Sequence, residues 1–153
     1  MSLHKPFEQV WWCDFNSISH AMFDCNCLIG VADNTPGVDT RANSDRSRFV
    51  PRFILPHDEN KPVAQDHLDM VLRIAEHAQR LRWMPLVTFC WAGQHRSPAL
   101  CAVLQSHLFD WPLEESIAGV SRLWPDFQTK HRHGVYASSL LALYEKIRTP
   151  PNQ

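Results

Sequence analysis

The sequence predicts an α/β domain with a central mixed, largely parallel sheet of about four to five strands flanked by helices. Three observations support this prediction. Strand-like apolar runs come early in the chain, and an amphipathic helical pattern separates them from another apolar run at residues 86–90. A strand, a helix and a second strand in this order form the unit that builds parallel sheets. The 153 residues are 44% hydrophobic and 20% charged, which fits one packed domain over residues 1–148 and a polar tail, 149–153.

The strands are expected in four segments. Residues 8–15 are aromatic and strand-like, and residues 27–32 form a short apolar run that ends at an Asn-Thr-Pro-Gly turn. A third apolar run surrounds residues 53–55, and the fourth is 86–90. The polar, arginine-bearing residues 38–47 read as a surface loop.

The helices are predicted from apolar residues at helical spacing. Residues 66–82 carry such a stripe and lead to the strand at 86–90. A second pattern runs from Ser97 to Leu108, a third covers 113–123, and a fourth covers 135–147. Trp111-Pro112 separates two of these helices, since proline interrupts a helical pattern.

The strongest chemical signal is the loop between residues 90 and 96. Cys90 and Arg96 enclose five residues, and the loop leads directly into a helix that begins near Ser97. Backbone N–H groups at a helix start favour an anion, and a guanidinium matches two phosphoryl oxygens. Both positive features also favour the thiolate form of a cysteine. The sequence therefore predicts a phosphate-binding loop with a nucleophilic sulfur.

This strand, loop and helix resemble the signature of the cysteine-dependent protein tyrosine phosphatases, in particular their small dual-specificity branch. The family loop reads His-Cys-x-x-Gly-x-x-Arg-Ser/Thr, and Cys90, Gly93, Arg96 and Ser97 match it. Phe89 departs from it, because the family usually places a histidine there. Short motifs recur by chance, so a second feature is needed.

Asp58 is that second feature. It follows the apolar run at 53–55, precedes a helix and lies 32 residues before Cys90, where dual-specificity phosphatases place their general acid. A positioned carboxylic acid that protonates the leaving oxygen contributes roughly 10² to 10⁴ in rate. The alternative is a solvated loop carboxylate. Asp126, in Trp124-Pro125-Asp126, spells the acid motif of larger tyrosine phosphatases but follows the nucleophile, so we expect a turn there.

The resemblance implies a phosphatase-type domain that hydrolyses phosphoproteins, chiefly phosphotyrosine, through a phosphocysteine intermediate. Cys90 would be the nucleophile, Arg96 would bind phosphate, Asp58 would be the acid, and Ser97 would assist departure of the sulfur. The remaining loop residues are expected to bind substrate: Trp91, Ala92, Gly93, Gln94 and His95.

Two of these loop residues leave alternatives open. Trp91 either packs under the loop or forms an aromatic wall of the pocket. His95 either meets substrate at the rim or braces the loop. The loop contains no lysine, which weakens the case for a polyanionic substrate. Two other functions remain: a sulfurtransferase or arsenate-reductase-like enzyme, and a phosphate-binding module without turnover.

Net charge and the number of cysteines limit the kinds of partner and the cellular compartment that we expect. The net charge is −1, which calls for neither nucleic acid nor membrane, and no signal or spanning pattern is evident. Five cysteines without framework spacing and a thiolate nucleophile indicate a reducing compartment, so we expect a cytoplasmic protein that uses no cofactor. Oligomeric state is not predicted.

The other cysteines and histidines have simpler interpretations. Cys25 and Cys27, with Cys13 and His20, invite a zinc site, but alternate strand residues point to opposite faces, so we expect no metal. Cys101 is expected to be a buried filler, with a redox partnership to Cys90 as the alternative. Among the histidines, we expect His67 and His77 on the polar side of their helix. We expect His131 and His133 in a basic loop.

Overall fold

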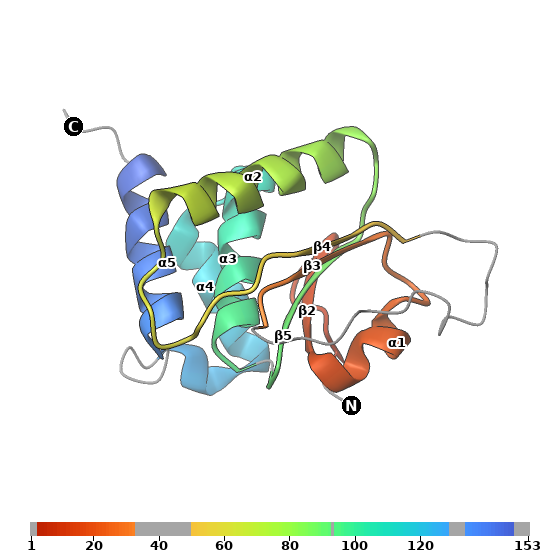
Figure 1. Cartoon of the computed structure of the whole chain (residues 1–153), viewed down its shortest axis with the longest axis horizontal. Coiled ribbons are helices and arrows are strands. Elements are labelled where there is room, and N and C mark those ends of the chain that lie inside the picture. The colour runs from red at the N-terminus through yellow and green to blue at the C-terminus, as the bar shows by residue number, and fades with distance from the viewer. Residues whose placement is uncertain (1–2, 33–49, 93, 129–133, 149–153) are drawn as a thin grey trace.

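The computed structural model describes residues 3–32, 50–92, 94–128 and 134–148, which fold around a five-stranded sheet (Figure 1). Across the sheet the strands run in the order β1-β2-β5-β3-β4, with β1 antiparallel to β2 and all other neighbours parallel. The predicted mixed, largely parallel sheet is therefore confirmed. The strands are β1 (Leu3–His4), β2 (Val10–Asp14), β3 (Cys27–Gly30), β4 (Arg52–Ile54) and β5 (Leu86–Cys90).

All four predicted helices are present, each within two residues of its expected ends. Trp124-Pro125-Asp126 leads into a short 3-10 turn, as expected, and Trp124 is half-buried against the core. The helices are α1 (Ile18–Ala21), α2 (Gln65–Arg80), α3 (Arg96–Phe109), α4 (Leu113–Leu123) and α5 (Gly134–Arg148), with 3-10 turns η1 (Phe15–Ser17) and η3 (Pro125–Gln128).

Strand β5 occupies the centre of the sheet. All five of its residues are buried, which is why residues 86–90 read as a continuous apolar run rather than an alternating one. Its parallel register sets Cys90 beside Asp14 of β2 and Phe89 beside Gly30 of β3. Three strands therefore end together at one edge of the sheet, and Cys90 lies at that edge.

Helix α3 follows β5 and forms the middle of the larger core. Every residue from Arg96 to Ser106 is buried, because the helix contacts β2, β5, α2, α4 and α5. A helix that is apolar on all sides is expected to be buried in this way. Pro98 fits its first turn, where a backbone N–H would have no partner within the helix. Figure 1 shows α2, α4 and α5 arranged around α3.

The opposite face of the sheet carries a smaller cluster under α1. Phe89 belongs to this cluster, whereas Cys90 belongs to the larger core, since neighbouring residues of a strand point to opposite faces. The Phe89 ring lies against the α-carbon of Gly30, where any Cβ would overlap it. The members of this second cluster are Trp11, Cys13, Ile18, Ala21, Met22, Cys25, Leu28, Val50, Val87 and Phe89.

Several predictions fall outside the described residues. They are the surface loop at 38–47, His131 and His133 in the basic loop, and the polar tail at 149–153. Within the described ranges, no helix has both the length and the hydrophobicity needed to cross a bilayer.

Candidate active site

Cys90 ends β5 with its sulfur enclosed by the protein. Its side chain is 2% exposed, and its Sγ lies 3.2 Å from the Ser97 Oγ on the first turn of α3. Ser97 is fixed from two directions: the Thr88 hydroxyl donates to the Ser97 carbonyl at 2.9 Å, and the Ser97 Oγ lies 3.4 Å from the Cys13 carbonyl oxygen. A hydroxyl in this position can donate to a sulfur anion.

Arg96 is the first residue of α3, and its side chain is held by backbone carbonyls. The guanidinium is 4% exposed, and its Nη1 donates to the His57 carbonyl at 2.6 Å and to the Val31 carbonyl at 3.3 Å. These bonds restrict the orientation of the planar group, which lowers the entropy lost when it binds an oxyanion. The same helix start presents amide N–H groups that favour an anion.

Cys90, Arg96 and Asp58 line one cleft of about 270 Å³. The cleft thus combines the thiol and the cation of one loop with a carboxyl group from a separate part of the chain. Gly93, which the sequence predicts in the same loop, lies outside the described residues. The other residues that line the cleft are Glu59, Asn60, Trp91, Ala92, Gln94 and His95.

Asp58 is held in its loop by local hydrogen bonds. Its Oδ1 accepts from the Asn60 backbone N–H at 2.8 Å, the geometry of an Asx turn. The loop is tied to β3, since Leu55 donates to the Gly30 carbonyl at 2.8 Å and His57 donates to the Val31 carbonyl at 3.2 Å. The strand next to β5 therefore positions the segment that carries the carboxyl group.

Asp126 takes a different position. It lines an adjoining hollow of about 470 Å³ together with Trp124 and does not border the cleft of Cys90. The two hollows share four lining residues: Glu59, Asn60, Gln94 and His95. The interpretation of Trp124-Pro125-Asp126 as a turn agrees with this arrangement.

Trp91 and His95 occupy opposite parts of the loop. The Trp91 ring is 39% exposed, lines the cleft and packs on Phe15 with ring centroids 4.6 Å apart. It forms a wall of the cleft rather than a support beneath the loop. His95 lines the cleft too, and its Nδ1 lies 3.7 Å from Glu59 Oε2, so it also links the loop to the segment that carries Asp58.

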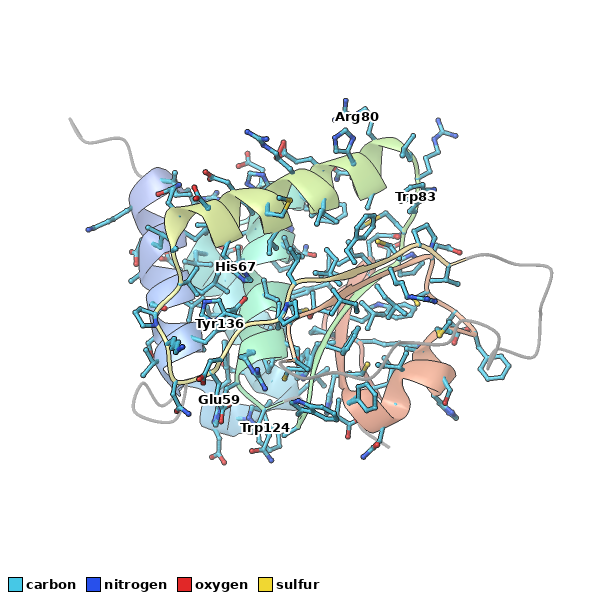
Figure 2. The ribbon with its side chains drawn as sticks, in the orientation of Figure 1. Glu59, His67, Arg80, Trp83, Trp124 and Tyr136 are labelled. Carbon is cyan, nitrogen blue, oxygen red and sulfur yellow. The ribbon has the colours of Figure 1, made fainter. Side chains whose placement is uncertain are left out.

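A group of three aromatic side chains behind the cleft, a buried Tyr136 and the half-buried His57 and His67, was not anticipated from the sequence. The His57 ring contacts both other rings, with ring centroids 4.8 Å from each, and His67 Nε2 is 2.8 Å from the Tyr136 hydroxyl oxygen. Figure 2 shows His67 of α2 and Tyr136 of α5 pointing toward each other. Because Arg96 donates to the His57 carbonyl, this group supports the guanidinium.

The expectation that His67 lies on the polar side of its helix is wrong, whereas His77 is exposed as predicted. Burial, with the nearby His57, lowers the pKa of His67 to about 4, so its ring is neutral near pH 7. Burial also raises the pKa of Tyr136 above its ordinary value, although the Arg96 cation acts in the opposite direction. A single polar ring on an otherwise amphipathic helix gives no local signal of such a partner.

The remaining cysteines stay apart from the chemistry of the cleft. Burial raises the pKa of Cys13 and of Cys101 well above the ordinary thiol value, which keeps both protonated. Cys101 is fully buried in α3, as predicted for a filler. Cys25 and Cys27 belong to different clusters, and in the ranges that the structure describes no three potential ligands gather around a metal site.

The sequence matches no family profile and has no significant match among curated proteins. Solved structures are similar over nearly the whole chain. Human DUSP28 has a TM-score of 0.70 at 16% identity, with 97% of each chain covered. Tk-PTP in its active form has a TM-score of 0.69 at 15% identity, with 95% of each chain covered.

The chain has the fold of the dual-specificity phosphatases. A third structure, PTPMT1 in complex with PI(5)P, has a TM-score of 0.66 at 15% identity and covers 97% of both chains. The dual-specificity phosphatase fold is thus shared at sequence identities of 15% to 16%. It confirms the fold class predicted from the order of strands and helices.

Proposed function

We propose that this protein is a cysteine-dependent phosphatase that hydrolyses phosphate monoesters of phosphoproteins, with phosphotyrosine as the preferred residue. One observation carries the proposal: Cys90, Arg96 and Asp58 line a single cleft at the carboxyl edge of the sheet. The dual-specificity phosphatase fold supports it. The whole of residues 1–148 serves as one catalytic domain, with 149–153 as a tail.

In the first step, the Cys90 thiolate attacks phosphorus, the bond to the leaving oxygen breaks, and Asp58 donates a proton to that oxygen. Arg96 and the loop amides stabilise the charge on the three remaining phosphoryl oxygens. The substrate side of the loop is supplied by Trp91, Ala92, Gly93, Gln94 and His95. The product of this step is phosphocysteine and a free alcohol or phenol.

In the second step, water attacks the phosphocysteine and Asp58, now a carboxylate, accepts the proton of that water. The sulfur leaves as a thiolate, and the Ser97 hydroxyl, 3.2 Å away, donates a hydrogen bond to it. A hydrogen bond to an ionised sulfur favours its departure. Both steps use only side chains of this chain, so no cofactor is required.

The choice of phosphotyrosine follows from the walls of the cleft. The exposed Trp91 ring, packed on Phe15, offers an aromatic surface to a phenyl phosphate. No lysine stands in the loop to attract a polyanion. A thiolate nucleophile requires a reducing compartment, so we place the protein in the cytoplasm.

Two other functions were open from the sequence. A sulfurtransferase or arsenate reductase would also use Cys90, but the carboxyl group of Asp58 in the same cleft favours a reaction in which an ester oxygen is protonated as it leaves. A phosphate-binding module without turnover was raised by Phe89. The Phe89 ring lies in the second cluster, on the face of the sheet away from Cys90, and it does not line the cleft, so it leaves room for substrate beside the sulfur.

The test is hydrolysis of matched phosphotyrosine and phosphoserine peptides in the presence of EDTA. We expect turnover of the phosphotyrosine peptide that EDTA does not reduce and that Cys90→Ser abolishes, while the variant still binds vanadate. Cys101→Ala, a second cysteine of the core, serves as the matched control and should retain turnover. Turnover of sulfane sulfur or arsenate without phosphate release, or peptide binding without turnover, would exclude a phosphatase.

A further inference from the structure

His57 precedes the proposed acid Asp58 in the chain and does not itself line the cleft of Cys90. Its backbone and its ring nevertheless bind two different parts of the site. The His57 carbonyl accepts from Arg96 Nη1 at 2.6 Å, and its ring Nδ1 lies 2.8 Å from the Asp58 carbonyl oxygen. A carbonyl oxygen can only accept, so Nδ1 carries the proton and donates the hydrogen bond. One residue is therefore hydrogen-bonded both to the cation and to the residue that bears the carboxyl group.

These two hydrogen bonds act on consecutive peptide groups. Arg96 holds the peptide group that joins His57 to Asp58, and the His57 ring holds the next one, which joins Asp58 to Glu59. Because each peptide group is planar, fixing two in succession restricts rotation of the Asp58 backbone between them. The Asp58 carbonyl also accepts from the Lys61 N–H at 3.2 Å, so the His57 ring adds a second and shorter bond. The carboxyl group is thereby held in one direction relative to the guanidinium.

The His57 ring is in turn held by two helices. It contacts the ring of His67 from α2 and the ring of Tyr136 from α5, with ring centroids 4.8 Å away in both cases. These two side chains are joined to each other by a hydrogen bond of 2.8 Å. The Tyr136 backbone N–H also donates to the Glu59 carbonyl at 2.9 Å. Helix α5 therefore holds the segment on both sides of Asp58, through the ring before it and the carbonyl after it.

We propose that His57 is a positioning residue of the phosphatase reaction, which sets the direction of the Asp58 carboxyl group relative to the Arg96 guanidinium. This role rests on the proposed function, since it concerns protonation of the leaving oxygen. The alternative is that the His57 ring only fills the space between α2, α5 and the loop. Positioning requires the ring N–H, whereas packing requires only a ring of similar size.

Two substitutions separate these roles. His57→Phe keeps an aromatic ring and removes the donor, whereas His57→Asn loses the ring and keeps an N–H donor close to the position of Nδ1. Both variants are assayed on a series of aryl phosphates that differ in the acidity of the phenol. On the poorest leaving groups we expect His57→Phe to lower kcat by about tenfold to a hundredfold, because a misplacement of about 1 Å costs up to about 10² in rate. On the most activated phenol the loss should be much smaller, and His57→Asn should recover most of the activity.

Vanadate affinity is measured on the same variants. The bond to Arg96 uses the backbone carbonyl of His57, which both variants keep, so vanadate binding should be nearly unchanged. A variant that is merely less stable loses the same factor on every substrate, so the dependence on the leaving group distinguishes positioning from packing. His77→Phe, at an exposed histidine of α2, is the matched control and should leave every rate unchanged.

Tyr136→Phe gives a second measurement that leaves His57 in place and decides the question if His57→Phe does not fold. It removes the hydroxyl bonded to His67, so it should cause a smaller loss with the same dependence on the leaving group. An equal loss on every substrate in these variants, or a His57→Asn variant as impaired as His57→Phe, would overturn the positioning role. Turnover that Cys90→Ser abolishes would still support the proposed function in that case, whereas a wild type that releases no phosphate would overturn both.

Discussion

The two ends of helix α3 differ in how their buried polar side chains are hydrogen-bonded. At the amino end, Arg96 and Ser97 are buried and their side chains are hydrogen-bonded to backbone carbonyls and to Cys90. At the other end, Gln105 is equally buried, and no described donor reaches its Oε1. Polar side chains at the first end are held by hydrogen bonds next to the cleft, whereas at the second end one oxygen has no described donor. Substitutions should therefore affect turnover at one end and stability at the other.

The largest effect is expected from Asp58→Asn, which removes the acid from the reactive end. General-acid help matters most when the leaving group is poor, so kcat on phosphotyrosine should fall by about 10² or more. The loss should be smaller with an activated aryl phosphate, and KM should barely change. Initial rates over a series of aryl phosphates with different phenol acidities measure this dependence.

Asp126→Asn is the matched control, because this carboxylate lines the adjoining hollow instead of the cleft. We expect no leaving-group-dependent loss from it. If Asp126→Asn shows that loss and Asp58→Asn does not, the acid has been assigned to the wrong residue.

Ser97→Ala tests the next contact at the same end. Without the hydroxyl 3.2 Å from the sulfur, departure of the thiolate from phosphocysteine should slow by about tenfold, the worth of a hydrogen bond to a charged group. Rapid-mixing experiments should then show a burst of released phenol before a slow steady state. The absence of a burst together with an unchanged kcat would remove Ser97 from the second step.

At the opposite end, Gln105→Met should raise the free energy of unfolding by about 1 kcal/mol, since it removes a buried acceptor that has no described partner. Turnover should stay the same. Gln79→Met is the matched control, because Gln79 donates to the Leu108 carbonyl at 2.9 Å and its loss should lower stability by a similar amount. Chemical denaturation measures the free energy of unfolding of both variants. A Gln105→Met variant less stable than the wild type would contradict the contrast between the two ends of α3.

The smallest effect concerns pH. His67 has its pKa lowered to about 4 by burial, compared with 6.5 in an unfolded chain, so between these values the unfolded state binds more protons. The contribution of the neutral His67 ring to the free energy of unfolding is therefore complete above pH 6.5, and it is lost as the pH falls toward 4. After allowance for its partial exposure this amounts to about 1 kcal/mol. Denaturation at pH 7.5 and 5 should show the loss in the wild type and less of it in His67→Phe, whereas His77→Phe should behave as the wild type.

The fold could be predicted from the sequence because most of its helices and strands have a recognisable local sequence pattern. Residues 86–90 are apolar throughout, as a central parallel strand requires, and the helical stripe in α2 has a clear period. The order of a strand, a helix and a strand then limits the topology. The position of β2 next to β5 had no such signal, since it depends on a pairing between segments distant in the chain.

The candidate site was predictable only in part for the same reason. The spacing of Cys90 and Arg96 lies within one loop, so it could be recognised directly. The ring of Tyr136 behind Arg96, and the carbonyls of Val31 and His57 that hold the guanidinium, come from other elements and carry no sequence pattern. A backbone carbonyl is present at every residue, so sequence cannot indicate which one accepts.

The hydrogen bonds of Arg96 also bear on how the protein folds. Its two carbonyl partners lie 65 and 39 residues away along the chain, so closing these contacts requires long loops to form first. The guanidinium can be fixed only after β3 has paired with β5 and the Asp58 loop has returned to the sheet. A partly folded chain therefore holds Cys90 without the guanidinium in place, and the proposed nucleophile meets its cation only once these long-range contacts have formed.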